Sequence, residues 1–581
     1  MKAMQWDACT ADDTRKPRSG AALRLLGVLF IAALLRLPGL DRWPPPLYQD
    51  EASRLYDAWC LLETGGDRHG ARWPLMLESF GEGDYTAALT TYLTIPFVAV
   101  LGPTETAARL PDALLGVATV ALLYFLVRRL SGEAAAVIAA IVLATDPWHL
   151  LLCRTAHESG FAPFFLALAL LATASAGLLR ESGETAQTGG TMFRRCAWAI
   201  LAGLAFGLHT WIYPATRVFT PLFLVALLLV FARSWRWRLD RTNDGAPITA
   251  ALAGLAIGTM PLWITALSDA SRIAARSRVA IWAQPPEIVD SPSLKFVQNE
   301  LSNLSPLYYF YRSDELSGAT LEGIGLHLVV TAPLWIAGLV LTVRTLRRSR
   351  WSRLLLAWLL LYPGPAALCA DWNPHPFRTI SGMLLYPILA GIGGAFLIRH
   401  VPAVRQRVVI ICASTAMACN LVYFVDVYVS NLQPRLEAGY QTGLVRAMRF
   451  VGGNMNDADF VLVTREFVQP YIYALLYAPI EPASLQALPK ISGPDRLGFH
   501  QFIQLGKFFF PPRDPLTRPE LTAQFNKALE SLPQGAVGLV IELEGAFPEG
   551  QVIATFPNGT RKPVEVRRWR RSAVASAAPA D

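Results

Sequence analysis

Apolar stretches long enough to cross a membrane recur along the chain up to about residue 425. A spanning helix needs about 20 largely apolar residues. The pattern therefore predicts a mostly α-helical, polytopic membrane protein with about eleven transmembrane helices. The predicted spans are residues 20–38, 106–127, 133–152, 160–179, 197–213, 216–232, 248–267, 326–343, 354–370, 379–398 and 408–425.

A further apolar stretch, residues 85–101, is shorter and carries several threonines and tyrosines. Arginines gather after every second predicted span, and Lys and Arg are typical of cytoplasmic loops. These loops all lie on the cytoplasmic side only if the N-terminus is cytoplasmic and residues 85–101 do not cross. We therefore expect residues 85–101 to form a helix in the outer interface.

The pattern changes after about residue 431. Runs typical of strands cover 458–464 and 535–543, and residues 437–451, 470–477 and 521–532 favour helices. This predicts a small exported α/β domain that contacts the acceptor or covers the outer site. The predicted organisation is a cytoplasmic tail (1–19), a transmembrane catalytic domain (20–431) and the exported domain (432–581).

Composition fits one membrane part and one soluble part, because the 581 residues are 53% hydrophobic and 17% charged. The formal charge of +8 could suggest nucleic acid, but most arginines lie between spans, where membrane orientation explains them. No nucleic-acid partner is expected. The seven cysteines are scattered and predict neither a disulfide framework nor a zinc knuckle. No glycine-rich phosphate loop is evident, so no nucleotide is expected.

Two carboxylates, Asp50 and Glu51, follow the first predicted span directly. Acids this close to a bilayer are costly to keep and indicate chemistry. Arginines and histidines recur at later outer span ends. A carboxylate can take the proton of an attacking hydroxyl or amine, and Arg and His can stabilise charge on a departing phosphate. The arrangement suits a lipid-phosphate donor and an exported acceptor.

Five segments in order resemble the GT-C class of membrane glycosyltransferases: Asp50-Glu51, 109–116, 147–156, 213–217 and 374–378. The most similar branch is glycosyltransferase family 39, with protein O-mannosyltransferases and aminoarabinose transferases as relatives. The resemblance implies a GT-C fold, a polyprenyl-phosphate-linked sugar donor and transfer on the non-cytoplasmic face. The Trp-Trp-Asp signature of oligosaccharyltransferases is missing, which argues against en bloc transfer to Asn. No clear Lys follows Glu82, so the phosphate site of the aminoarabinose enzymes is not expected intact.

By the same resemblance, Asp50 matches the essential acid, the expected base, and Glu51 is its partner. Arg378 matches a basic residue near the donor phosphate, and Arg217 and Arg154 are further phosphate-binding candidates. A divalent cation is a possible cofactor, because carboxylates and imidazoles are suitable ligands. Its candidate ligands are Asp50, Glu82, His157 and Glu158. The remaining candidate site residues are Glu82, Asp84, His157, Glu158, His209, Tyr213 and His375.

Several of these candidate residues also have a purely structural interpretation. Asp50 and Glu51 can simply begin a helix, since acids favour the first turn. Residues 81–84 can be a solvated turn. His209 can be a core histidine, and Arg217 and Arg378 can reach to the membrane interface.

The predicted function is transfer of a single sugar from a polyprenyl phosphate to an exported protein, lipid or glycan. The enzyme would be a multi-pass protein of the cell inner or plasma membrane. An alternative is a polyprenyl-linked glycan polymerase or ligase, which would not be expected to carry Asp-Glu in its first outer loop. A transporter is less favoured, because the span interiors are nearly free of charge and no repeated halves are evident.

Overall fold

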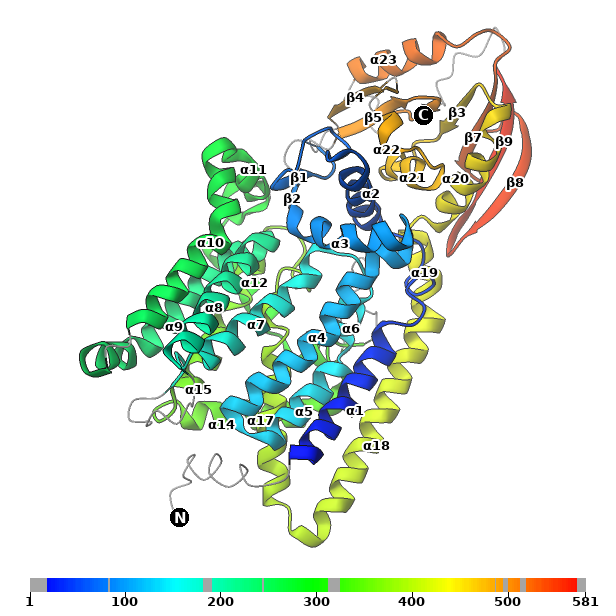
Figure 1. Cartoon of the computed structure of the whole chain (residues 1–581). Helices are drawn as coiled ribbons and strands as arrows, with labels where there is room; N and C mark the ends of the chain where they lie inside the picture. The colour runs from blue at the N-terminus through cyan, green and yellow to red at the C-terminus, as the bar shows by residue number, and fades with distance from the viewer. Residues whose placement is uncertain are drawn as a thin grey trace. The chain divides into compact units, whose positions relative to one another are not determined.

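The computed structural model describes residues 18–571 except 82–83, 181–190, 243–244, 312–323, 486, 489, 495–499 and 513–518. The chain divides into two compact units, which are described separately (Figure 1). The helical unit comprises Met1–Pro38, Asp112–Ser268 and Arg276–Asp426. The mixed unit comprises Gly39–Pro111, Asp269–Ala275 and Val427–Asp581.

The helical unit contains most of the apolar helices, and α4 belongs to it from Asp112 onward. They are α1 (Arg18–Arg36), α4 (Glu105–Ser131), α5 (Glu133–Ala144), α6 (Pro147–Cys153), α7 (Ala162–Ser175), α8 (Met192–Ile212), α9 (Pro214–Thr242), α10 (Gly245–Asp269), α12 (Pro292–Asn303), α13 (Pro306–Phe310), α14 (Ala332–Thr345), α15 (Arg350–Leu361), α16 (Gly364–Ala367), α17 (Leu385–His400) and α18 (Ala403–Val427).

Seven helical stretches in the described residues are long and apolar enough to cross a membrane, or eight if α5 and α6, bent by 56°, form one span. The predicted multi-pass helical fold is confirmed. The count by this measure is lower than the eleven predicted spans, although each of those contains a helix. The stretch that includes α14 is a shorter apolar helix, and α15 has only 12 residues. The predicted interfacial stretch forms α3 (Ala88–Leu101), whose 14 residues extend about 21 Å, less than the hydrocarbon core of about 30 Å.

Glycines let the helices of this unit approach closely. A Cβ added to Gly338 of α14 would lie 1.9 Å from the carbonyl oxygen of Leu389 in α17. The same atom on Gly203 of α8 would lie 1.9 Å from the carbonyl oxygen of Ala251 in α10. Without hydrophobic driving force inside a bilayer, such backbone contact is a main source of helix association.

The mixed unit joins a long first loop to the C-terminal part of the chain. Its first loop holds α2 (Gln49–Thr64), the β1–β2 hairpin (Met76–Glu78 and Tyr85–Ala87) and α3. The later elements are α11 (Ser271–Ala274), α19 (Gln433–Gly439), α20 (Thr442–Asn454), β3 (Phe460–Val463), α21 (Pro470–Tyr477), α22 (Pro482–Leu485), β4 (Lys490–Pro494), β5 (His500–Leu505), β6 (Phe508–Phe509), α23 (Pro519–Glu530), β7 (Val537–Leu543), β8 (Gln551–Asn558) and β9 (Arg561–Arg570).

A seven-stranded sheet with the order β4-β5-β6-β3-β7-β9-β8 forms the centre of the C-terminal part (Figure 1). β3 runs parallel to both β6 and β7, and the other pairs are antiparallel. All four residues of β3 are buried, as expected for a central strand. α23 covers one face through Leu521 and Phe525, which pack with Phe460 and Val540. The predicted α/β character of the C-terminal part is confirmed.

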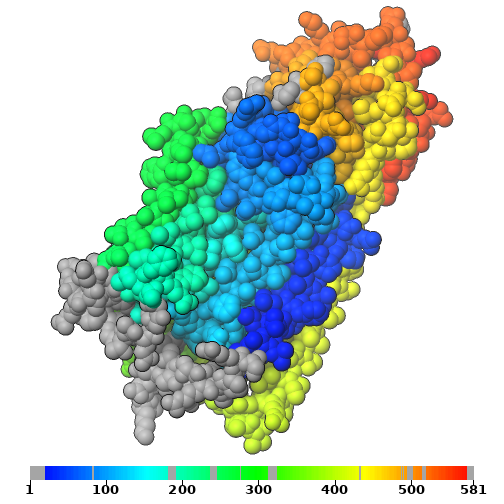
Figure 2. All heavy atoms as spheres, in the orientation of Figure 1, coloured from blue at the N-terminus to red at the C-terminus, as the bar shows by residue number. Residues whose placement is uncertain are grey.

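The first loop packs with the C-terminal part of the chain, although the sequence pattern grouped it with the membrane spans. α2 contacts α21 and α22, and the Tyr56 hydroxyl donates a hydrogen bond to the carbonyl of Ile480 over 2.8 Å. Figures 1 and 2 show the blue residues of this loop against orange residues of the C-terminal part. Contacts between segments hundreds of residues apart leave no pattern in the local sequence. The predicted domain boundary at residue 431 therefore could not show that the first loop groups with the C-terminal part.

Candidate functional site

Asp50 and Glu51 lie in the first turn of α2, and their surroundings differ. Three prolines lead into the helix, which begins at Gln49. Asp50 is exposed, whereas Glu51 is only 3% exposed. The Glu51 carboxylate reaches back and accepts a hydrogen bond from the Tyr48 N–H over 2.8 Å, which caps the helix. Asp50 therefore faces outward from a helix start fixed by its neighbour.

Arg109 holds Glu51 from the other side. Its guanidinium is fully buried and donates from Nε to Oε1 over 2.9 Å and from Nη2 to Oε2 over 3.0 Å. Its remaining donors bind the carbonyls of Leu40, Pro44 and Pro45. A buried guanidinium with five donors suits such a set of planar acceptors. Glu51 thus forms a buried ion pair that fixes the start of α2.

The surroundings of Asp50 include α21 from the C-terminal part of the mixed unit. Burial raises the pKa of Tyr473, and the negative charge of Asp50 adds to the rise. Burial also raises the pKa of Tyr440, and the Glu51 charge adds to it. Asp50 and Glu51 therefore both lie near tyrosines of the C-terminal segment.

A second ion pair in the mixed unit was not predicted from the sequence. Arg68 Nη1 lies 2.8 Å from Asp57 Oδ2, and each side chain is 2% exposed. Arg68 also donates to Ser53 and to the carbonyls of Glu78 and Ser79. Burial raises the pKa of Asp57 to about 7, although Arg68 acts to lower it. The pair ties α2 to the β1–β2 hairpin, and nothing in the local sequence pattern indicates it.

In the helical unit, a loop after α16 holds Arg378 against Asp371. The guanidinium is bidentate, with Nη1–Oδ1 at 2.7 Å and Nη2–Oδ2 at 3.0 Å. Burial acts to raise the pKa of Asp371, but the hydrogen bonds and charge of Arg378 outweigh it, so that this pKa is lowered. The pair is only partly covered, because the Arg378 side chain is 15% exposed and that of Asp371 is 42% exposed.

Aromatic and imidazole rings gather beside this pair. The His157 ring stacks on Phe377 with centroids 4.0 Å apart and planes 12° apart, and Tyr213 meets His157 edge-on at 5.9 Å. His157 Nδ1 accepts a hydrogen bond from the Ser159 N–H over 3.1 Å. Tyr213 is extended and directly precedes Pro214, which disfavours helical conformation there and ends α8.

Burial, and then the positive charge of Arg378, lower the pKa of His375 to about 3, so its ring is neutral at ordinary pH. The His375 N–H donates to Asn303 Oδ1 over 3.0 Å, and the Arg378 N–H donates to His375 Nδ1 over 3.4 Å. The fold thus brings together residues predicted from three separate outer turns. We call this set the outer-turn cluster: His157, Tyr213, Asp371, His375, Phe377 and Arg378.

Arg154, predicted to bind the donor phosphate, is instead occupied by backbone carbonyls. It donates to Leu35 O and Arg36 O over 3.2 and 3.1 Å, and to Pro38 O over 2.8 Å. These are among the last carbonyls of α1 and its following turn, which a cation stabilises. Arg154 therefore caps α1, and its phosphate contact stays a prediction from the sequence.

The other candidates differ in their surroundings. His209 is fully buried, with Nδ1 2.7 Å from Thr220 Oγ1 of α9, which corresponds to the core interpretation. Arg217 is half-buried in the first turn of α9, and Glu158 begins a short 3₁₀ helix. Asp84 is 8% exposed, and its backbone closes a turn with Ser79. Glu82 lies outside the described residues.

The predicted metal ligands do not form a site in the part of the chain that the structure describes. No group of three or more His, Cys, Asp or Glu side chains there is arranged to hold an ion. His157 uses Nδ1 in its own 3₁₀ turn. The divalent cation stays a prediction from the sequence.

Comparison with known proteins relates the fold to solved structures. The fold resembles that of ArnT from Cupriavidus metallidurans bound to undecaprenyl phosphate, with a TM-score of 0.56 and 12% identity over 97% of this chain and 100% of that chain. The apo form of ArnT gives a TM-score of 0.53 and 11% identity over 94% and 98%. An Archaeoglobus fulgidus oligosaccharyltransferase tethered with an acceptor peptide gives 0.49 and 14% identity over 90% and 69%. No curated protein matches the sequence.

The chain shares its fold with ArnT, in line with the GT-C fold that the five sequence segments predicted. Residues 86–264 match the family model described as dolichyl-phosphate-mannose-protein mannosyltransferase.

Proposed function

We propose that this protein transfers one sugar, a hexose or a pentose, from a polyprenyl phosphate to an exported acceptor. Asp50 is the observation that carries the proposal, because an exposed carboxylate is held at a helix start by a fully buried Glu51–Arg109 ion pair. The bound undecaprenyl phosphate of the similar ArnT structure, and the match to a dolichyl-phosphate-mannose family model, support the donor class.

In this mechanism, Asp50 accepts the proton of an acceptor hydroxyl or amine as that group attacks the anomeric carbon. The bond between this carbon and the phosphate oxygen breaks, and its electron pair stays on the phosphate. A single displacement of this kind inverts the anomeric configuration. Glu51 and Arg109 serve as positioning residues that keep Asp50 in place.

The outer-turn cluster is the proposed contact for the departing phosphate. Arg378 binds the Asp371 carboxylate through both terminal nitrogens, and Nη1 also donates to the Asp371 carbonyl over 3.3 Å. Nη2 carries a second N–H that can face the phosphate. Preorganised donors of this kind stabilise developing negative charge. Because the His375 ring is neutral, the positive charge that can meet the phosphate here is that of the Arg378 guanidinium. Arg217 is a further candidate for the same phosphate.

The proposal places residues 50 and 378 on the outer side of the inner or plasma membrane, with the N-terminus in the cytoplasm and residues 432–581 exported. The arginine-rich loops between predicted spans support this orientation. Reporter fusions at both positions test it, and opposite locations for residues 50 and 378 would contradict the mechanism.

The direct test uses the full-length enzyme in lipid nanodiscs with a radiolabelled sugar on polyprenyl phosphate. Asp50→Asn should lower transfer by roughly 10²–10⁴-fold, the usual contribution of a general base, while the protein stays folded. Asp41→Asn, a substitution at an exposed acid of the same loop, is the matched control and should keep normal turnover. Near-normal transfer by the Asp50 variant would rule out its role as the base.

A further inference from the structure

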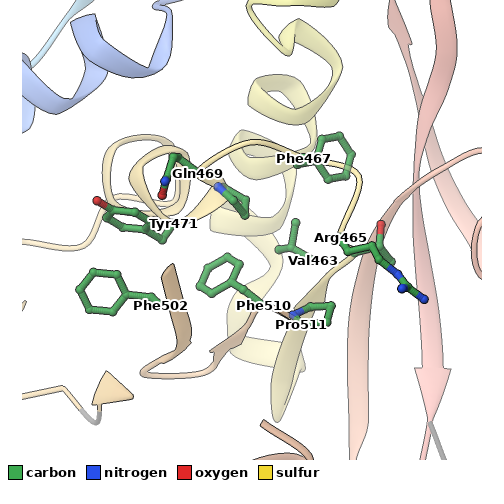
Figure 3. Close-up of a pocket in the computed structure, with 10 residues that line it drawn as sticks. Val463, Arg465, Phe467, Gln469, Tyr471, Phe502, Phe510 and Pro511 are labelled. Atoms are coloured by element: carbon green, nitrogen blue, oxygen red, sulfur yellow. The ribbon is translucent and has the colours of Figure 1, made fainter. Parts of the chain in front are cut away.

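A small pocket of the mixed unit lies at the end of β3 (Figure 3). Two of the rings that line it, Tyr471 and Phe510, are buried, so the pocket offers a ligand no open ring face there. A buried hydrogen-bond arrangement in the helical unit bears more directly on function. It joins α12 to the loop that carries Asp371 and Arg378, which we call the cluster loop (residues 369–378).

Asn303, the last residue of α12, contacts the cluster loop with a fully buried side chain. Its Nδ2 donates to Asn373 Oδ1 over 2.7 Å, and its Oδ1 accepts from the His375 N–H over 3.0 Å. Nδ2 also donates to the Asn299 carbonyl of its own helix over 2.8 Å. Both ends of one buried amide are therefore used, and two of these three hydrogen bonds hold the cluster loop.

Asn299 adds a second attachment from the same side of α12. It precedes Asn303 by four residues, which places both side chains on one face of the helix. Its Nδ2 donates to the carbonyl of Cys369 over 2.9 Å and to that of Ala367 over 3.2 Å. α12 thus holds the beginning of the cluster loop as well as its middle.

Asn373 connects this attachment to the ion pair of the outer-turn cluster. While its Oδ1 accepts from Asn303, its Nδ2 donates to the Asp371 carbonyl over 3.1 Å and to that of Cys369 over 3.0 Å. The Asp371 carbonyl also accepts from Arg378 Nη1, and the Asp371 carboxylate binds both terminal nitrogens of Arg378. A continuous series of hydrogen bonds therefore runs from Asn303 through Asn373 and Asp371 to Arg378.

Trp372, between Asp371 and Asn373, shows that the cluster loop needs such support. Its φ of 26° is a left-handed value, uncommon for a residue other than glycine and unfavourable for a bulky one. The side chain is 70% exposed, so its own packing does not maintain this conformation. Strained backbone persists only where the surroundings fix it, and here the fixed neighbours are Asp371 and Asn373. Without Asn303, the loop should relax and carry Asp371 with it.

We propose that Asn303 is a positioning residue for the departing phosphate. By holding the cluster loop, it fixes the Asp371 carboxylate and, through this carboxylate, the Arg378 guanidinium. The inference rests on the phosphate role proposed for Arg378. A donor stabilises developing charge best when it is already in place, so a shifted guanidinium should bind the phosphate less well. A residue that only ended α12 would leave phosphate binding unchanged.

The test measures binding of radiolabelled undecaprenyl phosphate, and of undecaprenol, which lacks the phosphate, to the full-length protein in nanodiscs. Asn303→Ala should weaken undecaprenyl phosphate binding by roughly three- to tenfold, the size expected from losing neutral hydrogen bonds, and should leave undecaprenol binding unchanged. Asn373→Ala breaks the same series at a half-buried residue and should act alike, so a poorly folded Asn303 variant does not end the test. Gln298→Ala, at an exposed amide of α12, is the matched control and should bind both lipids normally.

A double-mutant cycle separates action through Arg378 from an independent effect. In the Arg378→Ala background, Asn303→Ala should no longer change undecaprenyl phosphate binding, and additive losses would overturn the inference. Equal losses for both lipids in the asparagine variants would overturn it as well. Normal undecaprenyl phosphate binding by Arg378→Ala would contradict the proposed phosphate site and the inference with it. Normal binding by both asparagine variants, beside a weakened Arg378 variant, would overturn the inference alone.

Discussion

Two neighbouring acids, Asp50 and Glu51, show how much one position changes the role of a carboxylate. The sequence predicts a helix start here, and it favours chemistry for both groups. It could not show that Glu51 turns inward, because the reason is Arg109, which is far along the chain and buried. Asp50, one position earlier in the helix, stays exposed. The two together give an exposed carboxylate at a fixed helix start.

Glu51→Gln should destabilise the protein strongly. It leaves the buried Arg109 guanidinium without its counter-charge, and breaking a buried pair costs about 3–5 kcal/mol. Thermal unfolding of the detergent-solubilised protein measures the effect, together with transfer activity, which should fall because Asp50 loses its support. Glu63→Gln alters an exposed acid in the same helix and should shift stability by no more than about 0.5 kcal/mol. Equal unfolding temperatures for the two variants would contradict a structural role for Glu51.

His375 should make the protein less stable in acid. Its folded pKa of about 3 lies below the unfolded value of about 6.5, so the unfolded chain binds a proton that the folded chain does not. Stability should therefore fall as pH drops through the window from about 6.5 to about 3. His375→Asn keeps an acceptor near the Arg378 N–H and should make the loss of unfolding temperature with falling pH shallower. An identical acid dependence in both proteins would show that His375 is not held neutral.

At the level of helices, arginines cap helix ends, and one of these, Arg154, was predicted from the sequence as a phosphate ligand. Arg154 binds the last carbonyls of α1, and Arg36 of α1 donates to Leu143 O and Ala144 O at the end of α5. Each helix end thus receives a guanidinium from the neighbouring segment. Hydropathy locates the spans but does not show which arginine turns back to a helix end and which faces a substrate.

Arg154 and Arg378 should be separable by kinetics. Arg378→Ala removes a charged donor and should raise the KM for the polyprenyl donor by roughly 10- to 100-fold, since hydrogen bonds to charged groups contribute about 1.5–3 kcal/mol. Arg154→Ala should lower the unfolding temperature because α1 loses its cap, while the donor KM of the folded fraction stays near normal. A large donor KM effect in the Arg154 variant would restore its predicted phosphate role.

Predicted elements agree well with the structure where they depend on local pattern. The stretches 458–464, 470–477 and 535–543 contain β3, α21 and β7. The outer-turn cluster was predicted in part, since His157, Tyr213, His375 and Arg378 were chosen as candidates. Phe377, which stacks on His157, was not, because an aromatic residue near a span end is also typical of the membrane interface.

For the whole molecule, the division into two units changes how the C-terminal part should be tested. Its elements pack with residues 39–111 from the beginning of the chain, through Tyr56 with Ile480 and Tyr48 with Tyr440. From the sequence, the predicted role of residues 432–581 is to contact the acceptor or to cover the outer site, so their removal would be expected to alter that role. The structure shows that it would also expose the buried face of α2.

Truncation before residue 432 should therefore abolish transfer and lower the yield of folded protein, because α2 loses the partners that bury it. Size-exclusion profiles and transfer assays measure both effects. Removal of residues 572–581 alone, which lie outside the described residues, serves as the control and should leave both unchanged. A stable truncated protein with normal turnover would show that α2 holds Asp50 without help.

The three-segment composition of the mixed unit has a consequence for biosynthesis. A ribosome delivers residue 50 early, whereas α21 and α22, against which α2 packs, emerge only after the last apolar helix has been inserted. The Asp50 carboxylate thus acquires its final setting at the end of translation. An unfinished copy in the membrane would carry this acid on a helix that still lacks its packing partners.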